Sequence, residues 1–246
     1  MNSYLKSLLM TGVLLCVALP AAIEAKAQQI SSFEALRKMA DEGTPPDVIT
    51  FAGNGEPTMH PDFAKIIDAT LKCRDRYYPN AKVSVLSNAT LIGRKEVAEA
   101  LKRVDNPILK IDASSDELVQ KINKPVGHYR LDEVVENLMQ FKGRFILQTM
   151  FLKSKEFDTV ASGALEAWMD IVRMLRPRQV MVYTIDRETP DKTLAKCTVE
   201  EMTAMVQPLI DEGFESVIAI SAEGNEVVYT TNTETGIATY IYSFKP

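Results

Sequence analysis

Short apolar runs alternate with amphipathic stretches along most of the chain. The apolar runs are rich in Val or Ile, which is typical of strands buried on both faces. They cover residues 48–52, 82–87, 108–112, 145–149, 180–185 and 217–220. Between them, apolar residues recur at intervals of three and four, which predicts helices whose apolar stripes face a core. The repeated alternation of strand and helix predicts a parallel sheet in an α/β fold.

The two ends of the chain depart from this pattern. Lys6 is followed by an apolar run over residues 8–22 and then by Ala25-Lys26-Ala27, which fits a cleavage site. The run is too short to span a bilayer comfortably, so we expect a cleaved signal peptide at residues 1–27. A buried or interfacial helix would show the same apolar run. At the other end, two β-rich runs flank residues 232–236 and predict a β-hairpin within residues 222–246.

Composition and charge narrow the function classes. The chain is 46% hydrophobic and 25% charged, as globular proteins are, and its net charge is −5. It contains no block of Lys and Arg interleaved with aromatic residues, so we find no clear nucleic-acid or membrane surface in the mature chain. The only histidines, His60 and His128, lie in unrelated contexts, which argues against a histidine-based zinc site.

The chain has three cysteines. Cys16 belongs to the predicted signal peptide, whereas Cys73 and Cys197 lie far apart in the mature chain. A disulfide between these two is compatible with an oxidising compartment, but two isolated thiols on helical segments fit the pattern better.

Polar residues gather where each predicted strand ends, which is the edge at which α/β folds place their sites. Strands also become polar simply where they leave a core. The strand ends are GNGEPT at residues 53–58, Ser87 and Asn88, Asp112, Gln148, and residues 186–188. The glycines of the first segment let a ligand approach the backbone, and Glu56 offers a carboxylate that suits an ammonium group. The segment lacks the third glycine of a dinucleotide fingerprint.

The motifs together resemble one known family. Residues 47–60, DVITFAGNGEPTMH, are similar to the second-strand motif of radical S-adenosylmethionine proteins, closest to the Fe–S oxidoreductase subgroup with GNGEPT. The segments KVSVLSNAT, ILKIDA, QTMFLK and VMVYTIDRETP continue the resemblance in order, over roughly residues 33–214. The resemblance implies a partial (βα)6 TIM-like barrel at residues 28–221. It also implies an S-adenosylmethionine cofactor and a [4Fe–4S] cluster.

The resemblance also assigns site residues. Gly53, Asn54, Gly55, Glu56 and Pro57 would form the edge that receives the amino group of S-adenosylmethionine. Four further residues would line the cofactor and substrate cavity: Ser87, Asn88, Asp112 and Gln148. The substrate and the catalytic residues stay unassigned.

One part of the family pattern is missing from this sequence. The family's first strand ends in a CxxxCxxC loop whose thiolates bind the cluster, and no such triplet occurs here. Ligation of a cluster requires several thiolates close together, which Cys73 and Cys197 do not supply. We therefore expect no metal site, weak or lost binding of S-adenosylmethionine, and no radical chemistry.

Two interpretations follow from this conflict. The first is a radical S-adenosylmethionine family protein without its cluster, in a truncated or chimeric chain. The second is an exported, non-enzymatic binding domain that reuses the barrel. The leader predicts a periplasmic or secreted location, whereas the family's cofactor chemistry belongs to the cytoplasm. With the first strand missing, strand 48–52 should present an open edge. The leaderless protein should then be poorly soluble, and Ile49→Lys should improve its recovery.

Overall fold

The structure is a computed structural model that describes residues 15–18, 39, 41–43, 46–52, 55–185 and 191–219. It divides into two compact units, Met1–Ile108 and Leu109–Pro246, and the boundary falls inside strand β4 (Asn106–Lys110). The predicted C-terminal hairpin lies outside the described residues, as do Gly53, Asn54 and the polar residues 186–188.

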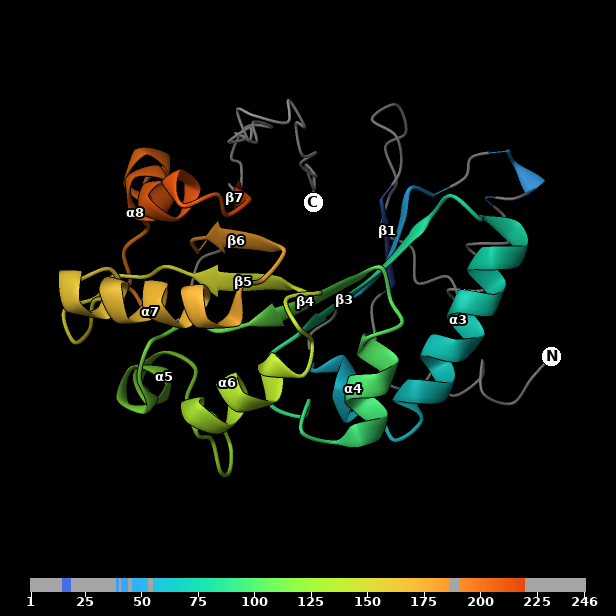
Figure 1. Ribbon diagram of the computed structural model, residues 1–246, viewed down its shortest axis with the longest axis horizontal. Helices are drawn as coiled ribbons and strands as arrows, with labels where there is room; N and C mark the ends of the chain where they lie inside the picture. Colours follow the sequence, from blue (N-terminus) through green and yellow to red (C-terminus); the bar gives the residue numbers. More distant parts are fainter. Residues whose placement is uncertain are drawn as a thin grey trace. The chain divides into compact units, whose positions relative to one another are not determined.

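The first unit contains a parallel strand pair with a helical crossover, drawn in blue-green in Figure 1. Strands β2 (Val48–Phe51) and β3 (Lys82–Ser87) are parallel, with Ile49 opposite Val83. The crossover contains the short 3-10 helix η1 (Pro57–Met59) and helix α3 (Phe63–Tyr77). Helix α4 (Lys95–Leu101) follows β3 and contacts α3. The apolar strand residues and the helix stripes meet in one core, as the periodicity predicts.

Asp105 links β3 and α3 of this unit. Its Oδ2 accepts a hydrogen bond from the backbone N–H of Val83 in β3 at 2.8 Å. The same oxygen pairs with Nη1 of Arg74, near the end of α3, at 2.7 Å. Burial pushes the pKa of Asp105 upward, but the Val83 N–H and the Arg74 guanidinium outweigh it, so the pKa lies below its ordinary value.

The edge of β2 is paired in the structure, by a segment of the predicted signal peptide. Strand β1 (Leu15–Ala18) runs antiparallel to β2 and places Val17 opposite Ile49. The β1 residues belong to the predicted signal peptide, so the segment that we expected to be removed covers this edge. The Ile49 side chain is 0% exposed. The open edge was expected for the chain without residues 1–27, which this pairing does not test. The burial of Ile49 argues against a benefit of Ile49→Lys, because the substitution would bury an unpaired charge.

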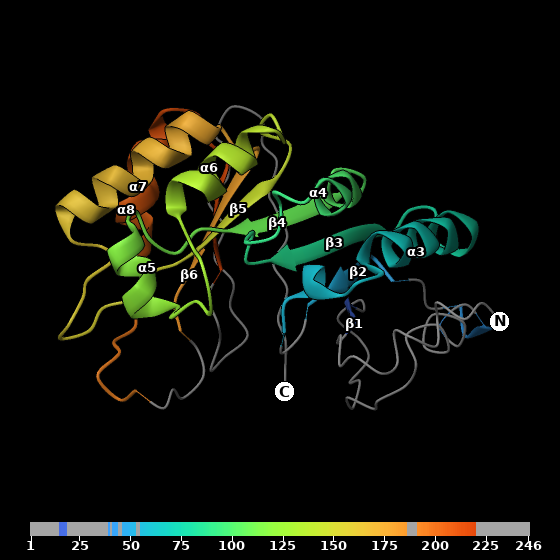
Figure 2. The same cartoon turned by 90° about the horizontal axis from the view of Figure 1, so that it is seen from below.

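The second unit contains three parallel strands in sequence order. They are β5 (Ile146–Met150), β6 (Gln179–Tyr183) and β7 (Ser216–Ala219). Helices α6 (Leu131–Met139) and α7 (Ser162–Leu175) lie side by side along β5 and β6 in Figures 1 and 2, and α8 (Val199–Asp211) contacts β7. The observed strands begin within two residues of the predicted ones, and the expected α/β fold with parallel strands is confirmed.

Helix α5 (Asp116–Ile122), which follows β4, was not predicted from the sequence. It is short, and its apolar stripe is too brief to stand out. Its beginning does carry a signal, because the Ser115 side chain accepts a hydrogen bond from the Leu118 N–H and two acidic residues follow in the first turn.

The two faces of the β5–β6 pair differ in burial. On the face toward α7, Leu147, Thr149, Val180 and Val182 are buried, and Trp168 Nε1 donates to Thr149 Oγ1 at 3.0 Å. The side chains that alternate with them are only half-buried: Gln148, Met150, Met181 and Tyr183. The first face belongs to the core. The second face is half-buried and carries the polar side chains of Gln148 and Tyr183.

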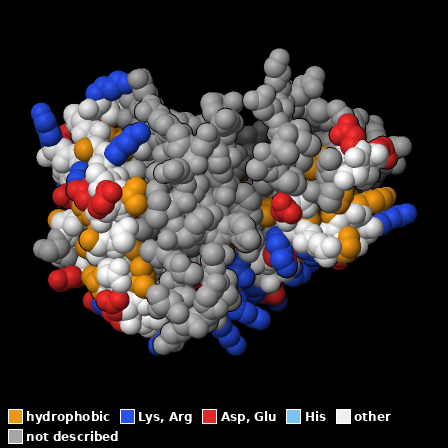
Figure 3. Space-filling view, turned by 90° about the horizontal axis from the view of Figure 1, so that it is seen from above, with side chains coloured by type: hydrophobic (Ala, Val, Ile, Leu, Met, Phe, Trp, Pro, Cys, Tyr) orange, Lys and Arg blue, Asp and Glu red, His pale blue; other side chains and the backbone are white. Residues whose placement is uncertain are grey.

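Charged side chains of both signs mix on the surface of this unit, as the left of Figure 3 shows. Arg173, for example, pairs with Asp170 at 2.9 Å and with Glu212 at 2.7 Å. Exposed pairs of this kind contribute little to stability. Within the described ranges, no helix combines the length and apolar character that crossing a bilayer requires.

Candidate functional site

Glu56 joins the segment after β2 to the end of β3. Its Oε1 accepts hydrogen bonds from the Thr58 N–H at 3.1 Å, the Thr58 hydroxyl at 2.5 Å and the Ser87 hydroxyl at 2.8 Å. Its Oε2 accepts from the Asn88 N–H at 2.7 Å. Three of these four donors meet at Oε1 and one at Oε2, so Oε2 keeps one of its two or so acceptor positions. Glu56 therefore braces the first motif segment against the second.

The residues after β3 are held by their own turns. The Asn88 Oδ1 accepts from the Thr90 N–H at 3.0 Å, and the Ser87 hydroxyl accepts from the Ala89 N–H at 3.1 Å. Ala89 has a φ of 63°, a left-handed conformation that is uncommon for alanine. The structure thus brings Glu56, Ser87 and Asn88 together in the first unit, as the resemblance implied.

Gly55 and Pro57, the two sequence neighbours of Glu56, differ in exposure. Pro57 is buried, whereas Gly55 is exposed, and a Cβ atom built on Gly55 would meet no atom within 4 Å. Nothing in the described fold therefore requires a glycine at this position. The free space beside its backbone is the kind that lets a ligand approach closely.

In the second unit, Asp112 lies just beyond the end of β4 and is 2% exposed. Its Oδ1 accepts from the Met150 N–H at 3.0 Å. Its Oδ2 accepts from Asn123 Nδ2 at 2.9 Å and pairs with Lys110 Nζ at 2.9 Å. Removing any one partner would leave part of a buried charge without compensation. Asp112, which we predicted as a cavity residue, is thus the centre of a buried polar cluster.

Lys110 and Tyr183 complete this cluster, and neither was singled out from the sequence. Lys110 Nζ lies 5.8 Å from the centroid of the Tyr183 ring. Burial lowers the pKa of Lys110, but the Asp112 charge and Tyr183 outweigh it, so the pKa lies above its ordinary value. Burial also raises the pKa of Tyr183, although Lys110 opposes the rise. At neutral pH the pair is an ammonium beside a neutral phenol.

Gln148 and Tyr129 border the cluster. Gln148 is half-buried on the same face as Tyr183, and its Nε2 has a weak acceptor in Met181 Sδ at 3.6 Å. Burial and the charge of Asp112 raise the pKa of Tyr129 to about 12, so its hydroxyl keeps its proton. Asp112 and Gln148, both expected to line a cavity, therefore belong to one half-buried polar face.

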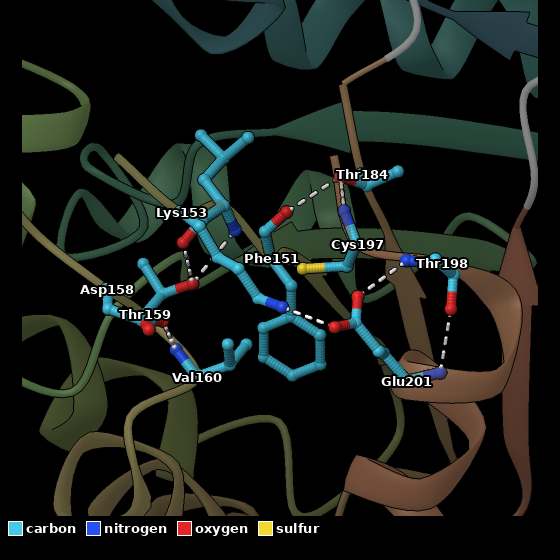
Figure 4. A network of polar contacts seen from close by, with 10 residues as sticks. Phe151, Lys153, Asp158, Thr159, Val160, Thr184, Cys197, Thr198 and Glu201 are labelled. Carbon is cyan, nitrogen blue, oxygen red and sulfur yellow. Dashed lines mark hydrogen bonds and ion pairs between the residues drawn. The ribbon is translucent and has the colours of Figure 1, made fainter. Parts of the chain in front are cut away.

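A separate polar network fixes the segments that follow β5 and β6 (Figure 4). Lys153 Nζ pairs with Glu201 in α8 at 2.5 Å. The Lys153 backbone bonds with that of Ala195 in both directions. The Thr184 hydroxyl donates to the Phe151 carbonyl and accepts from the Cys197 N–H, both at 3.0 Å. These contacts hold the start of α8 onto the segment after β5.

The cysteines serve packing in this structure. Cys197 is 4% exposed within the network, and burial raises the pKa of its thiol although Lys153 opposes the rise. Burial likewise raises the pKa of the Cys73 thiol in α3. Neither cysteine forms a disulfide in the structure. Cys73 lies in a helix as expected, whereas Cys197 lies just before α8. Raised pKa values disfavour the thiolate form that metal ligation uses.

Comparison with known proteins places this chain in a family. The family model described as the Radical SAM superfamily matches residues 22–156, just over half of the chain. The chain therefore belongs to the radical S-adenosylmethionine superfamily.

Two relatives of this chain are UPF0026 proteins. The protein from Methanocaldococcus jannaschii is 25% identical over 200 residues, covering 78% of this chain and 59% of the relative. The one from Synechocystis is 26% identical over 148 residues, covering 58% of this chain and 52% of the relative. The chain thus spans between half and three fifths of the length of these relatives.

Solved structures share the fold at low sequence identity. SuiB of Streptococcus suis bound to S-adenosylmethionine matches with a TM-score of 0.58 and 15% identity, over 86% of this chain and 49% of that one. A domain of the pyruvate-formate lyase-activating enzyme from Bacteroides vulgatus matches with a TM-score of 0.51 and 18% identity. That match covers 69% of this chain and 97% of that one. These likenesses establish the α/β fold of the family.

The [4Fe–4S] cluster that the family implies does not fit the residues of this sequence. Its three cysteines form no CxxxCxxC segment. Among the residues that the structure describes, no three His, Cys, Asp or Glu side chains form a group that could hold a metal ion. S-adenosylmethionine fits in part, because Gly55 leaves a backbone edge open. At Glu56, Oε1 is occupied by Thr58 and Ser87, whereas Oε2 accepts one hydrogen bond and has a further acceptor position for an ammonium group.

Proposed function

We propose that this chain is a cluster-free member of the radical S-adenosylmethionine superfamily that binds a small molecule on the family scaffold without radical chemistry. The observation that carries the proposal is the ligand set. The sequence has no CxxxCxxC segment, and burial raises the pKa of both Cys73 and Cys197. Without a bound cluster the chain has no group that could reduce S-adenosylmethionine.

S-adenosylmethionine itself is the candidate ligand, bound weakly at the backbone edge around Gly55. Support comes from the family match and from the open space beside this glycine. The loss of the iron chelate removes the strongest anchor. Two or three hydrogen bonds of about 1–1.5 kcal/mol each would leave a dissociation constant of roughly 1 mM or weaker.

Anaerobic reconstitution with iron and sulfide tests the absence of the cluster. After desalting, we expect far less than one iron per chain. We also expect no broad absorption at roughly 400 nm, where charge transfer from thiolate to iron absorbs. Cys73→Ala and Cys197→Ala serve as matched variants and should change nothing. A chromophore with about four irons per chain that either variant abolishes would overturn the proposal.

Calorimetry with S-adenosylmethionine tests the binding. We expect weak heats that Gly55→Val reduces, because the added side chain would occupy the open space. A submicromolar dissociation constant, or equal binding by both proteins, would contradict this part of the proposal.

We further propose that the chain is exported to the periplasm or beyond, where it acts as a binding domain. The apolar run at residues 8–22 and the small residues at Ala25 and Ala27 support export. Expression in a bacterium, followed by fractionation and mass determination of the N-terminus, is the test. A mature form that begins at Gln28 in the exported fraction is expected, and full-length protein in the cytosol would count against it.

A further inference from the structure

Lys110 and Tyr183 have no role in the function proposed above, although the fold holds both on one face. Lys110 belongs to β4 and Tyr183 to β6, so their side chains meet over the intervening strand β5. The Lys110 side chain is 25% exposed, whereas that of Asp112 beneath it is 0% exposed. Lys110 is therefore the more accessible member of this ion pair.

The pair has hydrogen-bond donors left over. An ammonium carries three N–H groups, and the partners of Lys110 among the described residues are Asp112 and Tyr183. The phenol of Tyr183 can accept from the ammonium and still donate its own proton. Two donors, one of them charged, thus remain for an acceptor on the half-buried side.

The charge of the cluster selects the kind of acceptor. Lys110 attracts an anion, but the carboxylate of Asp112 lies 2.9 Å from the same ammonium and repels a second negative charge. A dianion such as phosphate would meet that repulsion twice over and would find too few donors. A single carboxylate, with one charge and two oxygens, matches one N–H of Lys110 and the O–H of Tyr183.

We propose that Lys110 and Tyr183 form a binding subsite for the carboxylate group of a small organic acid. Gln148, whose amide has only the weak acceptor Met181 among the described residues, borders the subsite and can contact the rest of the ligand. The subsite names a ligand class for the binding role proposed above. It requires neither the cluster nor S-adenosylmethionine.

Titration of the full chain with propionate, at constant ionic strength, tests the subsite by isothermal calorimetry and by thermal unfolding. Propionamide has the same shape without the charge, and inorganic phosphate supplies the dianion. We expect saturable stabilisation by propionate, with at least ~10-fold weaker effects of the other two, because one hydrogen bond to a charged group is worth roughly a factor of 10 or more. Equal effects of all three probes would overturn the proposal.

Two variants test the residues. Tyr183→Phe removes one donor and should weaken propionate binding by about 5- to 10-fold. Lys110→Met alone would leave Asp112 buried and unpaired, so Lys110→Met with Asp112→Asn keeps the cluster neutral, and binding should fall by at least ~30-fold. The matched control is Lys121→Met with Glu117→Gln, a surface pair on α5 at 2.7 Å, which should change binding by less than about twofold.

The outcomes separate this inference from the proposed function. Unchanged propionate binding in both Tyr183→Phe and the neutral double variant would refute the subsite. The cluster test would be unaffected by that result. Conversely, a chromophore in the reconstituted protein would refute the cluster-free proposal and leave the propionate titrations valid, because these use neither iron nor S-adenosylmethionine.

Discussion

Glu56→Gln offers a quantitative test of whether this motif residue braces the fold. Glutamine preserves one acceptor oxygen, so the bonds from Thr58 and Ser87 at Oε1 can survive. In the variant, an amide group takes the place of Oε2, which in the parent accepts from the Asn88 N–H at 2.7 Å. An N–H of that amide then faces the Asn88 N–H, and the hydrogen bond is lost. A hydrogen bond to a charged group contributes about 1.5–3 kcal/mol, and partial exposure favours the lower end. We expect a local destabilisation of about 1.5–2 kcal/mol.

Amide hydrogen exchange measures this effect at the affected groups. A loss of about 1.5–2 kcal/mol corresponds to roughly 10- to 30-fold faster exchange of the Asn88 N–H group. Glu99→Gln is the control in the same unit, because Glu99 is exposed and pairs only with Lys102 among the described residues. Its effect at Asn88 should be less than about twofold. Unchanged protection of Asn88 in Glu56→Gln would refute the brace.

Three further predictions concern the first unit. Gly55→Ala should leave stability unchanged or raise it by up to about 1 kcal/mol in urea unfolding, because its Cβ meets no atom, and a clear loss would show a steric role that the described fold lacks. The pKa of Asp105 is lowered in the folded state, so its contribution to stability is present above about pH 4 and is lost as the pH falls through the folded pKa. Stability measured from pH 6 to 3 should therefore fall less steeply in Asp105→Asn than in the parent, and parallel curves would contradict this. Ile49→Lys should cost at least ~3 kcal/mol in the same unfolding assay, and soluble protein of parental stability would show that position 49 tolerates a charge.

The strand and helix pattern was predictable because each element carries a periodicity that burial imposes. The run Lys82–Ser87 was predicted with its observed bounds, since its apolar residues are buried on both faces. Helix α5 was not predicted because an apolar stripe of one or two turns cannot be told from a loop in the sequence. Only the cap at Ser115 marked its start. The pairing of β1 with β2 was not predicted for another reason. An apolar leader and an apolar edge strand have the same composition, so the sequence alone could not indicate that they pair.

The candidate site was predictable only as far as strand ends reveal it. Asp112 follows an apolar strand directly, so its place at the rim was evident from the sequence. Lys110 was not predicted as a site residue, because a lysine in a strand suggests a side chain that points into solvent. Its spacing of two residues from Asp112 was the available signal, since strand residues i and i+2 share a face. The partner Tyr183 lies more than seventy residues further on, and no local pattern joins the two.

The brace at Glu56 changes what the motif GNGEPT indicates. A motif found in a ligand-binding loop is usually taken as a sign that the ligand binds. Here the carboxylate of the motif is engaged by Thr58, Ser87 and Asn88, so the same residue stabilises the fold whether or not a cofactor is present. A chain that loses its cluster ligands would therefore still depend on this glutamate for stability. Gly55 is the opposite case, because the described fold makes no use of its missing side chain. Within this motif, retention of the glycine is the better indicator of a ligand, and retention of the glutamate indicates the fold.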